Sequence, residues 1–143
     1  EYSCEITGQT MPGDNRNQIT SDILTFIKQG ADMVICSGGM SVDPDDRTPG
    51  AIKDTGTDIV TYGAPVLPGA MLLVAYLDYK GRKISVLGLP GCVMYAKRTV
   101  FDLILPRVMA DDEIKAEEIA GLGEGGLCLN CPVCTFPNCG FGK

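Results

Sequence analysis

Residues 37–49 read Ser-Gly-Gly-Met-Ser-Val-Asp-Pro-Asp-Asp-Arg-Thr-Pro, and this stretch decides the expected fold and site. The apolar run 32–36 before it is typical of a buried strand. Thr48 and Pro49 at its end predict a helix start, because the hydroxyl can cap a helix and the proline ring fixes a helical φ. A strand, a Gly-Gly turn and a helix start together expose backbone N–H groups at the carboxyl end of the strand. Ligands, often phosphates, bind there in open α/β sheets.

Three carboxylates lie in the same loop, at Asp43, Asp45 and Asp46. They would repel a bare polyanion, so they favour a ligand with a polar ring, or a cation that shares the site. A strand-to-helix turn with solvated acids is the alternative from these residues alone, because glycine in loops often serves only the conformation of the turn.

The composition is that of an ordinary globular protein. The 143 residues suffice for one domain with a buried core, and 45% of them are hydrophobic and 21% charged. No apolar run reaches the roughly 18 residues that cross a membrane, and no basic segment followed by an apolar core predicts secretion. We therefore expect a cytoplasmic protein without a membrane partner. Because the chain begins at Glu1 rather than at Met, we expect it to be a fragment of a longer protein.

The charge pattern excludes one class of partner and limits the chemistry. The net charge is −6, and the 12 Lys and Arg residues are scattered along the chain. Nucleic acid is not expected as a partner, because binding needs a basic stripe against the phosphates. The chain has no His, which is the commonest general base and metal ligand. Proton transfer must therefore rest on Asp, Glu, Lys, Tyr, Cys or water, and metal binding on Cys or carboxylate.

Apolar periodicity and turn residues predict alternating strands and helices. Strands are expected at residues 2–7, 32–36, 57–61, 71–79 and 82–87. Helices are expected at residues 15–29, 48–53, 92–109 and 111–120. Strand–helix–strand order is the signature of right-handed crossovers onto a parallel sheet, and the last two strands form a hairpin at one side. The prediction is a three-layer α/β/α sandwich with a mostly parallel, mixed central sheet.

The loops that open the predicted helices should converge. Asp14 is placed to cap the first helix. In a parallel arrangement, the loops that lead from strands into helices emerge at one edge of the sheet. Asp14, the loop 38–48 and the Pro90-Gly91 turn are therefore expected to line one pocket.

Seven Cys residues fall into two groups. Three are isolated, and four crowd the last 16 residues, at Cys128, Cys131, Cys134 and Cys139. Without a secretion signal, such a cluster indicates a metal before disulfides. Four thiolates satisfy the ligand count of tetrahedral Zn²⁺ or an iron–sulfur cluster, but their spacing does not select the metal, and reduced, unstructured cysteines are the alternative. We divide the chain into an α/β domain, residues 1–120, and a glycine-linked Cys-rich tail, residues 121–143.

The motifs of residues 2–110 resemble those of one family. Gly38-Gly39-Met40-Ser41 followed by Asp46-Arg47-Thr48-Pro49 resembles the Gly-Gly turn and following acid of the molybdopterin-binding domain of molybdenum-cofactor biosynthesis. That family includes the molybdopterin adenylyltransferase and the molybdenum insertase. Pro68-Gly69 and Leu89-Pro90-Gly91 match further motifs in the expected order, and Asp14 matches a second acidic position of the adenylyltransferase branch.

Some positions depart from that family. Asp43 stands where the insertase branch usually has Gly, and Cys92 stands where Asn is usual. The opening strand and helix of the family would lie before Glu1, and neither branch has a Cys-rich tail. These departures bear on catalysis more than on pterin binding.

The resemblance implies a role for several residues at this edge. Backbone N–H groups would hold the terminal phosphate or pyrophosphate of a pterin ligand, at Gly38, Gly39, Met40 and Ser41. Thr48 would add a hydroxyl donor, as would the serine, and Pro90 and Gly91 would complete the cofactor site. Asp46 would orient the pterin amino groups or hold Mg²⁺ between phosphates. Asp46 and Asp14 are the catalytic candidates, although from the residues alone each is equally an acid at a helix start.

The implied ligands are molybdopterin or adenylated molybdopterin, with molybdate as a second small molecule. The family associates as dimers or trimers, so a homo-oligomer is expected. Three functions stay open. The first is a pterin-nucleotide enzyme that transfers adenylyl groups or inserts molybdate, and phosphoryl chemistry of that kind needs positioning rather than His. The second is a non-catalytic carrier or sensor of the cofactor. The third is a redox or metal-handling protein that uses the Cys tail.

Overall fold

The computed structural model describes residues 2–143, which form a mixed sheet between helices. The strands are β1 (Met33–Ser37), β2 (Asp58–Tyr62), β3 (Leu73–Tyr79) and β4 (Arg82–Leu89). The α-helices are α1 (Arg16–Gln29), α2 (Thr48–Asp54), α3 (Val100–Val108) and α4 (Ala116–Gly121). Two short 3₁₀ helices follow the last strand and the last α-helix, η1 (Gly91–Met94) and η2 (Leu122–Gly125).

The strand order is β1-β4-β3-β2. β1 pairs with β4 in parallel, whereas β3 is antiparallel to both β4 and β2. β1, β2 and β4 therefore point in one direction, although only one pair of neighbouring strands is parallel. The predicted α/β class and mixed sheet are confirmed, with two corrections. The sheet is mostly antiparallel rather than mostly parallel, because two of its three strand pairs are antiparallel. The β3–β4 hairpin occupies the middle of the sheet rather than one side, because both its strands carry runs of buried residues that must be covered on two faces.

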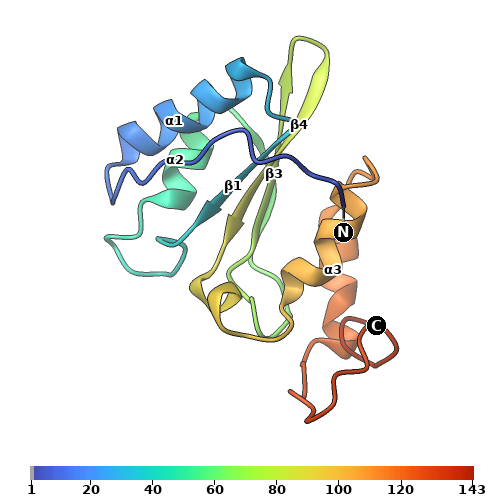
Figure 1. Ribbon diagram of the computed structural model, residues 1–143. Helices are drawn as coiled ribbons and strands as arrows, with labels where there is room; N and C mark the ends of the chain where they lie inside the picture. Colours follow the sequence, from blue (N-terminus) through green and yellow to red (C-terminus); the bar gives the residue numbers. More distant parts are fainter. Residues whose placement is uncertain (1) are drawn as a thin grey trace.

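Helices cover both faces of this sheet, as Figure 1 shows. α1 and α2 pack on one face, where the apolar stripe of α1 and the buried side of α2 meet the sheet at Ile19, Ile23, Ile27, Ala51, Ile52, Leu73 and Val86. α3 and α4 pack on the other, through Val74, Leu87, Val100, Ile104, Ile114 and Ile119. These two apolar layers establish the predicted three-layer α/β/α sandwich.

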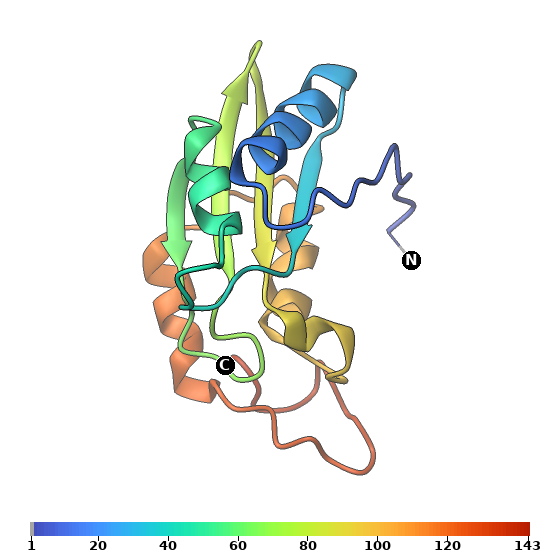
Figure 2. The same ribbon diagram turned by 90° about the vertical axis from the view of Figure 1, so that its left-hand side faces the viewer.

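The N-terminal segment differs from its prediction. Residues 2–7 do not form a strand, and Figure 2 shows them running past the sheet as an irregular chain. All six of these residues are exposed. Gly8 lies so close to α1 that a Cβ atom on it would be 2.5 Å from Phe26 Cε1. The alternation of residues 2–7 was therefore misleading, because a strand exists only where a partner strand accepts its hydrogen bonds.

The cap of α1 lies one residue later than predicted. Asn15 is extended (φ −82°, ψ 100°), and its side chain accepts a hydrogen bond from the Gln18 N–H at 3.1 Å. Asp14 is exposed and does not cap the helix. Gly30 ends the helix in the predicted left-handed conformation, with φ 108°.

The predicted helix 92–109 is interrupted. Residues 91–94 form η1, and α3 begins only after Thr99, which is extended and forms a capping box with Asp102. The Thr99 N–H donates to Asp102 Oδ2 at 2.8 Å. This cap fixes the helix start, so the apolar periodicity before it does not extend the helix.

The last α-helix is also shorter than predicted. It begins at Ala116 rather than at residue 111, because Asp111 adopts a left-handed conformation with φ 54°. The connecting segment is nevertheless fixed to the sheet. Ile114 is 1% exposed, and its N–H donates to the Tyr76 hydroxyl at 3.0 Å.

The glycine-rich segment 121–126 is a packed turn rather than a free link. It contains the end of α4 and η2, and then joins the loop before β3. The Leu67 N–H donates to the Gly126 carbonyl at 2.6 Å, and the Cys128 N–H donates to the Leu67 carbonyl at 2.8 Å. Phe141 is 5% exposed and belongs to the core beneath α3 and α4. The C-terminal residues thus share the core of the α/β domain.

Candidate pterin site at the carboxyl edge of the sheet

Three strands end at one edge of the sheet because β1, β2 and β4 share a direction. The segment 38–47, named here the glycine loop, leads from β1 into α2 at this edge, and η1 follows β4 there. Both figures show the glycine loop, η1 and the C-terminal tail at the same end of the molecule. This is the place where ligands bind in open α/β sheets.

Two glycines turn the glycine loop away from β1. Gly38 and Gly39 have φ values of 88° and 60°, which residues with a Cβ rarely adopt. A Cβ on Gly39 would also lie 2.7 Å from Thr48 Oγ1. The Thr48 hydroxyl donates to the Gly38 carbonyl at 2.9 Å, and the Thr48 N–H donates to the Gly39 carbonyl at 3.3 Å. These contacts bring the first turn of α2 directly against the Gly-Gly turn.

Thr48 has a different role from the one predicted. The N-cap of α2 is Arg47, which makes no side-chain capping hydrogen bond, and Thr48 is the first helical residue. Its side chain is 6% exposed, and its proton is directed to the Gly38 carbonyl. Thr48 therefore holds the loop in shape, and its hydroxyl proton is not free for a ligand.

Met40 anchors the loop to the sheet. Its side chain is 2% exposed and lies over Gly88 of β4, where a Cβ atom would be 2.5 Å from Met40 Cε. The absence of a side chain at Gly88 thus makes room for Met40. The buried thioether therefore fixes where the Met40 backbone lies.

Free backbone donors follow the Gly-Gly turn. Within residues 2–143, no hydrogen-bond acceptor is found for the N–H groups of Gly39, Met40 and Ser41. The Gly38 N–H, predicted to share this role, donates to the Leu89 carbonyl at 3.3 Å and continues the β1–β4 ladder. Three successive donors therefore remain for an anion such as a phosphate.

The three acids of the loop separate clearly by environment. Asp43 and Asp45 are exposed, and Asp45 only approaches Arg47 at 3.6 Å. Asp46 is half-buried, and its Oδ2 is fully buried without a hydrogen-bond partner among the described residues. Its own N–H donates to the Asp43 carbonyl at 2.9 Å, which closes a tight turn. Leaving such an oxygen unpaired costs about 1–3 kcal/mol, so the arrangement fits a ligand that donates to Asp46.

Tyr62 is a site residue that the sequence analysis missed. It ends β2, and its hydroxyl lies 3.0 Å from the Met40 carbonyl and 3.1 Å from the Ser41 carbonyl, to which it can donate in turn. Burial and the negative charge of Asp46 raise the pKa of Tyr62, so the phenol stays protonated. The available signal was its place directly after the predicted strand 57–61, where it lies level with Cys36 in the sheet.

A cavity of about 630 Å³ opens beside the Gly-Gly turn. Asp14, Gly38, Gly39 and Thr48 line it together with Met94 of η1. Asp14 and the glycine loop therefore do meet at one cavity. Pro90 and Gly91 lie directly before and at the start of η1 but do not line the cavity. Met40, Ser41 and Asp46 also lie outside its lining.

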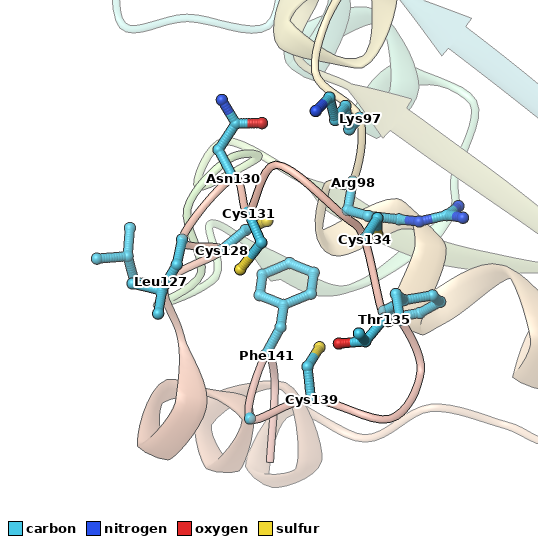
Figure 3. A pocket seen from close by; sticks show the side chains of 13 residues that line it. Lys97, Arg98, Leu127, Cys128, Asn130, Cys131, Cys134, Thr135, Cys139 and Phe141 are labelled. Atoms are coloured by element: carbon cyan, nitrogen blue, oxygen red, sulfur yellow. The ribbon is translucent and has the colours of Figure 1, made fainter.

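The Cys-rich tail forms a second site at the same end of the molecule. Cys128, Cys131, Cys134 and Cys139 are all free and line a smaller cavity of about 110 Å³, shown in Figure 3. Within residues 2–143, no three Cys, Asp or Glu side chains lie close enough together to hold a metal ion. Metal binding by these four thiols therefore stays a prediction.

The α/β sandwich with a Gly-Gly turn at its carboxyl edge defines a ligand-binding domain. A family model described as "Probable molybdopterin binding domain" matches residues 1–110, and the chain belongs to that family. The family resemblance of the sequence is thereby confirmed, and a role in molybdenum-cofactor biosynthesis follows from it. No curated protein matches the chain. In the part of the chain that the structure describes, no helix is both long and apolar enough to cross a membrane.

Proposed function

We propose that the glycine loop binds molybdopterin, or adenylated molybdopterin, during assembly of the molybdenum cofactor. The observation that supports this most strongly is the pairing of an unpartnered, buried Asp46 oxygen with three free backbone N–H groups. A pterin carries amino and ring N–H donors at one end and a phosphate at the other. Asp46 would accept from the donors, and the N–H groups of Gly39, Met40 and Ser41 would bind the phosphate.

The same oxygen would suit Mg²⁺, which prefers carboxylate ligands and bridges phosphates. These two roles of Asp46 differ in one measurable way. Chelation of divalent cations weakens ligand binding if Asp46 acts through Mg²⁺, and leaves binding unchanged if Asp46 contacts the pterin directly. The Asp46 oxygen and the three backbone N–H groups already match the donors and the phosphate of a pterin without a cation. We therefore assign to Asp46 a direct contact with the pterin.

The test is titration of purified molybdopterin into the protein, with binding followed by calorimetry. We expect Asp46→Asn to lower affinity about 10- to 100-fold, which corresponds to a lost charge-assisted hydrogen bond. Asp45→Asn is the matched control, since the Asp45 side chain is 96% exposed, and it should bind like the parent chain. Circular dichroism checks that both variants are folded. Equal affinity of Asp46→Asn and the parent chain would refute the site.

Catalysis is the second part of the proposal. With a phosphate held by backbone donors, adenylyl transfer or molybdate insertion would depend on positioning, with Asp46 and Asp14 as candidate acids. One observation favours binding without turnover: η1 carries Cys92, a half-buried thiol, where the family usually has an amide. Incubation with ATP, or with adenylated pterin and molybdate, separates an enzyme from a carrier. A homo-oligomer, dimer or trimer, is expected in either case and is measurable by light scattering.

A further inference from the structure

The smaller cavity, of about 110 Å³, lies between the C-terminal tail and the segment before α3. That segment contributes two basic side chains to the lining, Lys97 and Arg98, and the tail contributes the polar side chains of Asn130 and Thr135. Among the described residues, no Asp or Glu lines this cavity. The whole chain carries a net charge of −6, so two cations without an acid mark this cavity as a place that favours a negatively charged ligand.

Lys97 carries a charge that the folded chain does not neutralise. Its side chain is exposed, and none of the ion pairs formed within residues 2–143 includes it. Figure 3 shows the Lys97 side chain on the same side of the Phe141 ring as the amide of Asn130. An ammonium group and an amide both donate N–H groups, so both can donate to an acceptor that enters the cavity from this side.

Arg98 is fixed by two neighbours, and only part of its hydrogen-bonding capacity is used. Its Nη1 donates to Asp102 Oδ1 at 2.8 Å, and its guanidinium carbon lies 4.8 Å from the centre of the Phe136 ring. The other oxygen of Asp102 accepts from the Thr99 N–H, and Arg98 Nε is buried without an acceptor among the described residues. A planar guanidinium that is already fixed, and that keeps unpaired donors, binds an anion at a low cost in conformational entropy.

Apolar side chains also line the cavity, beside the four cysteines. They are the rings of Phe136 and Phe141, whose centres are 6.3 Å apart, and the side chains of Leu127 and Leu129. Leu129 is 76% exposed and Phe141 is 5% exposed, so this apolar lining runs from the surface to the core. An apolar cavity of about 150 Å³ binds benzene, so a cavity of this smaller size admits a body of about four or five carbon atoms.

We propose that this cavity binds a small monocarboxylate with a branched aliphatic body, of the size of 3-methylbutanoate. Its carboxylate accepts hydrogen bonds from Lys97 and Arg98, and its methyl groups lie against the ring of Phe141. A bare phosphate would satisfy the two cations but would leave the apolar lining facing water, whereas the aliphatic body covers that lining. The binding is non-covalent, and it does not depend on the proposed pterin site at the glycine loop.

The test is calorimetric titration of 3-methylbutanoate into the reduced whole chain. We expect saturable binding of one molecule per chain, weakened by sodium chloride because salt screens the attraction between charges. Lys97→Gln should lower the affinity about 3- to 10-fold and Arg98→Gln about 10-fold. Lys28→Gln is the matched control, because Lys28 is exposed, lies in α1 and does not line the cavity. Circular dichroism checks that the variants are folded, and Lys97→Gln, an exposed change, keeps the test valid if Arg98→Gln is not.

Two analogues separate the charge of the ligand from its shape. The amide 3-methylbutanamide keeps the aliphatic body but lacks the charge, and acetate keeps the charge but lacks most of the body. Each should bind at least about 10-fold more weakly than 3-methylbutanoate, because the proposal requires both the ionic contacts and the apolar contact.

The proposal is overturned if 3-methylbutanoate shows no saturable binding, or if Lys97→Gln binds it as tightly as the parent chain. Inorganic phosphate that binds more tightly and displaces 3-methylbutanoate would make this an oxyanion site instead. A stoichiometric metal in the purified chain, found by elemental analysis, would also overturn the proposal, because an ion held by the four thiols would occupy the cavity. None of these outcomes bears on the pterin site, because this cavity and the one beside the Gly-Gly turn share no lining residue.

Discussion

The glycine loop and the Cys-rich tail lie at the same end of the molecule but present their chemistry in different ways. The glycine loop offers backbone N–H groups and one acid, and its backbone is fixed by the buried Met40 and by the hydroxyls of Thr48 and Tyr62. The tail offers four side-chain thiols on an irregular chain, held by Phe141 and by backbone hydrogen bonds to Leu67. A backbone site depends on a few glycines and an anchor, whereas a side-chain site depends on where every thiol points.

The largest expected effect tests whether the tail really shares the core of the domain. Phe141→Ala should lower the free energy of unfolding by about 3 kcal/mol, because it removes a buried aromatic ring and leaves a cavity. Val133→Ala is the control, since Val133 is 77% exposed and should change stability little. Chemical denaturation followed by circular dichroism measures both. A free energy of unfolding for Phe141→Ala equal to that of the control would show that the tail does not share the core of the α/β domain.

The next effect tests the anchor of the glycine loop. Gly88→Ala places a methyl group against Met40 and near Leu73 Cβ, 3.1 Å away, and should cost about 1–3 kcal/mol through overpacking. Because the Met40 backbone moves with its side chain, pterin affinity should fall as well. In a Met40→Ala background the Gly88→Ala change should cost much less, and this double-mutant cycle measures the contact. Additive effects would mean that Met40 does not anchor the loop.

A smaller effect is expected at Tyr62. Tyr62→Phe removes the hydroxyl that bonds the carbonyls of Met40 and Ser41, at a cost of about 1 kcal/mol. The loop should become more mobile, so hydrogen exchange of the hydrogen-bonded Asp46 and Thr48 amides should accelerate, and pterin affinity should fall severalfold. Tyr95→Phe is the control, because Tyr95 is 82% exposed. Unchanged exchange in Tyr62→Phe would remove Tyr62 from the site.

The sequence indicated the glycine loop well because its signals are local. Gly38 and Gly39 follow from the φ requirements of the turn, the family resemblance implied Asp46, and the alternation of strand and helix predicted the layers. The sequence could not show that Thr48 donates to Gly38 rather than capping, or that Tyr62 reaches the loop, since both depend on tertiary contacts. The prediction of a strand at residues 2–7 was wrong for the same reason, because a strand forms only where a partner strand accepts its hydrogen bonds.

The directions of the thiols in the tail could not be predicted from the sequence, and the reason differs from that for the glycine loop. The spacing of Cys128 to Cys139 fixes the number of thiols but not their directions, and among the described residues no three potential ligands lie close enough to hold a metal ion. The direction of Cys128 and Cys139 is set by their packing against the core that contains Phe141, and this contact forms only on folding. In a sequence, a motif of side-chain ligands is therefore weaker evidence for the geometry of a site than a motif that fixes backbone conformation.

The smallest effect contrasts the thiols of the two regions. Cys36 lies in β1 beside the glycine loop, and burial raises its pKa to about 11, whereas Cys134 in the tail has a lowered pKa. The unfolded chain would ionise Cys36 near its ordinary value of 9.0. The folded state disfavours that charge, so the contribution of Cys36 to stability is fully present below pH 9 and is lost as pH rises through about 11. Cys36→Ala should flatten the fall in the free energy of unfolding over this range.

Alkylation compares the reactivity of Cys36 and Cys134 in a single experiment. At pH 8, iodoacetamide should modify Cys134 well before Cys36, because the thiolate fraction and the exposure of Cys134 are both larger. The tryptic peptide 116–143 contains all four tail cysteines, so fragmentation of this peptide is needed to locate the adduct. Modification of Cys36 at a comparable rate would mean that a reagent reaches this half-buried thiol through the cavity that it lines or through local opening of β1.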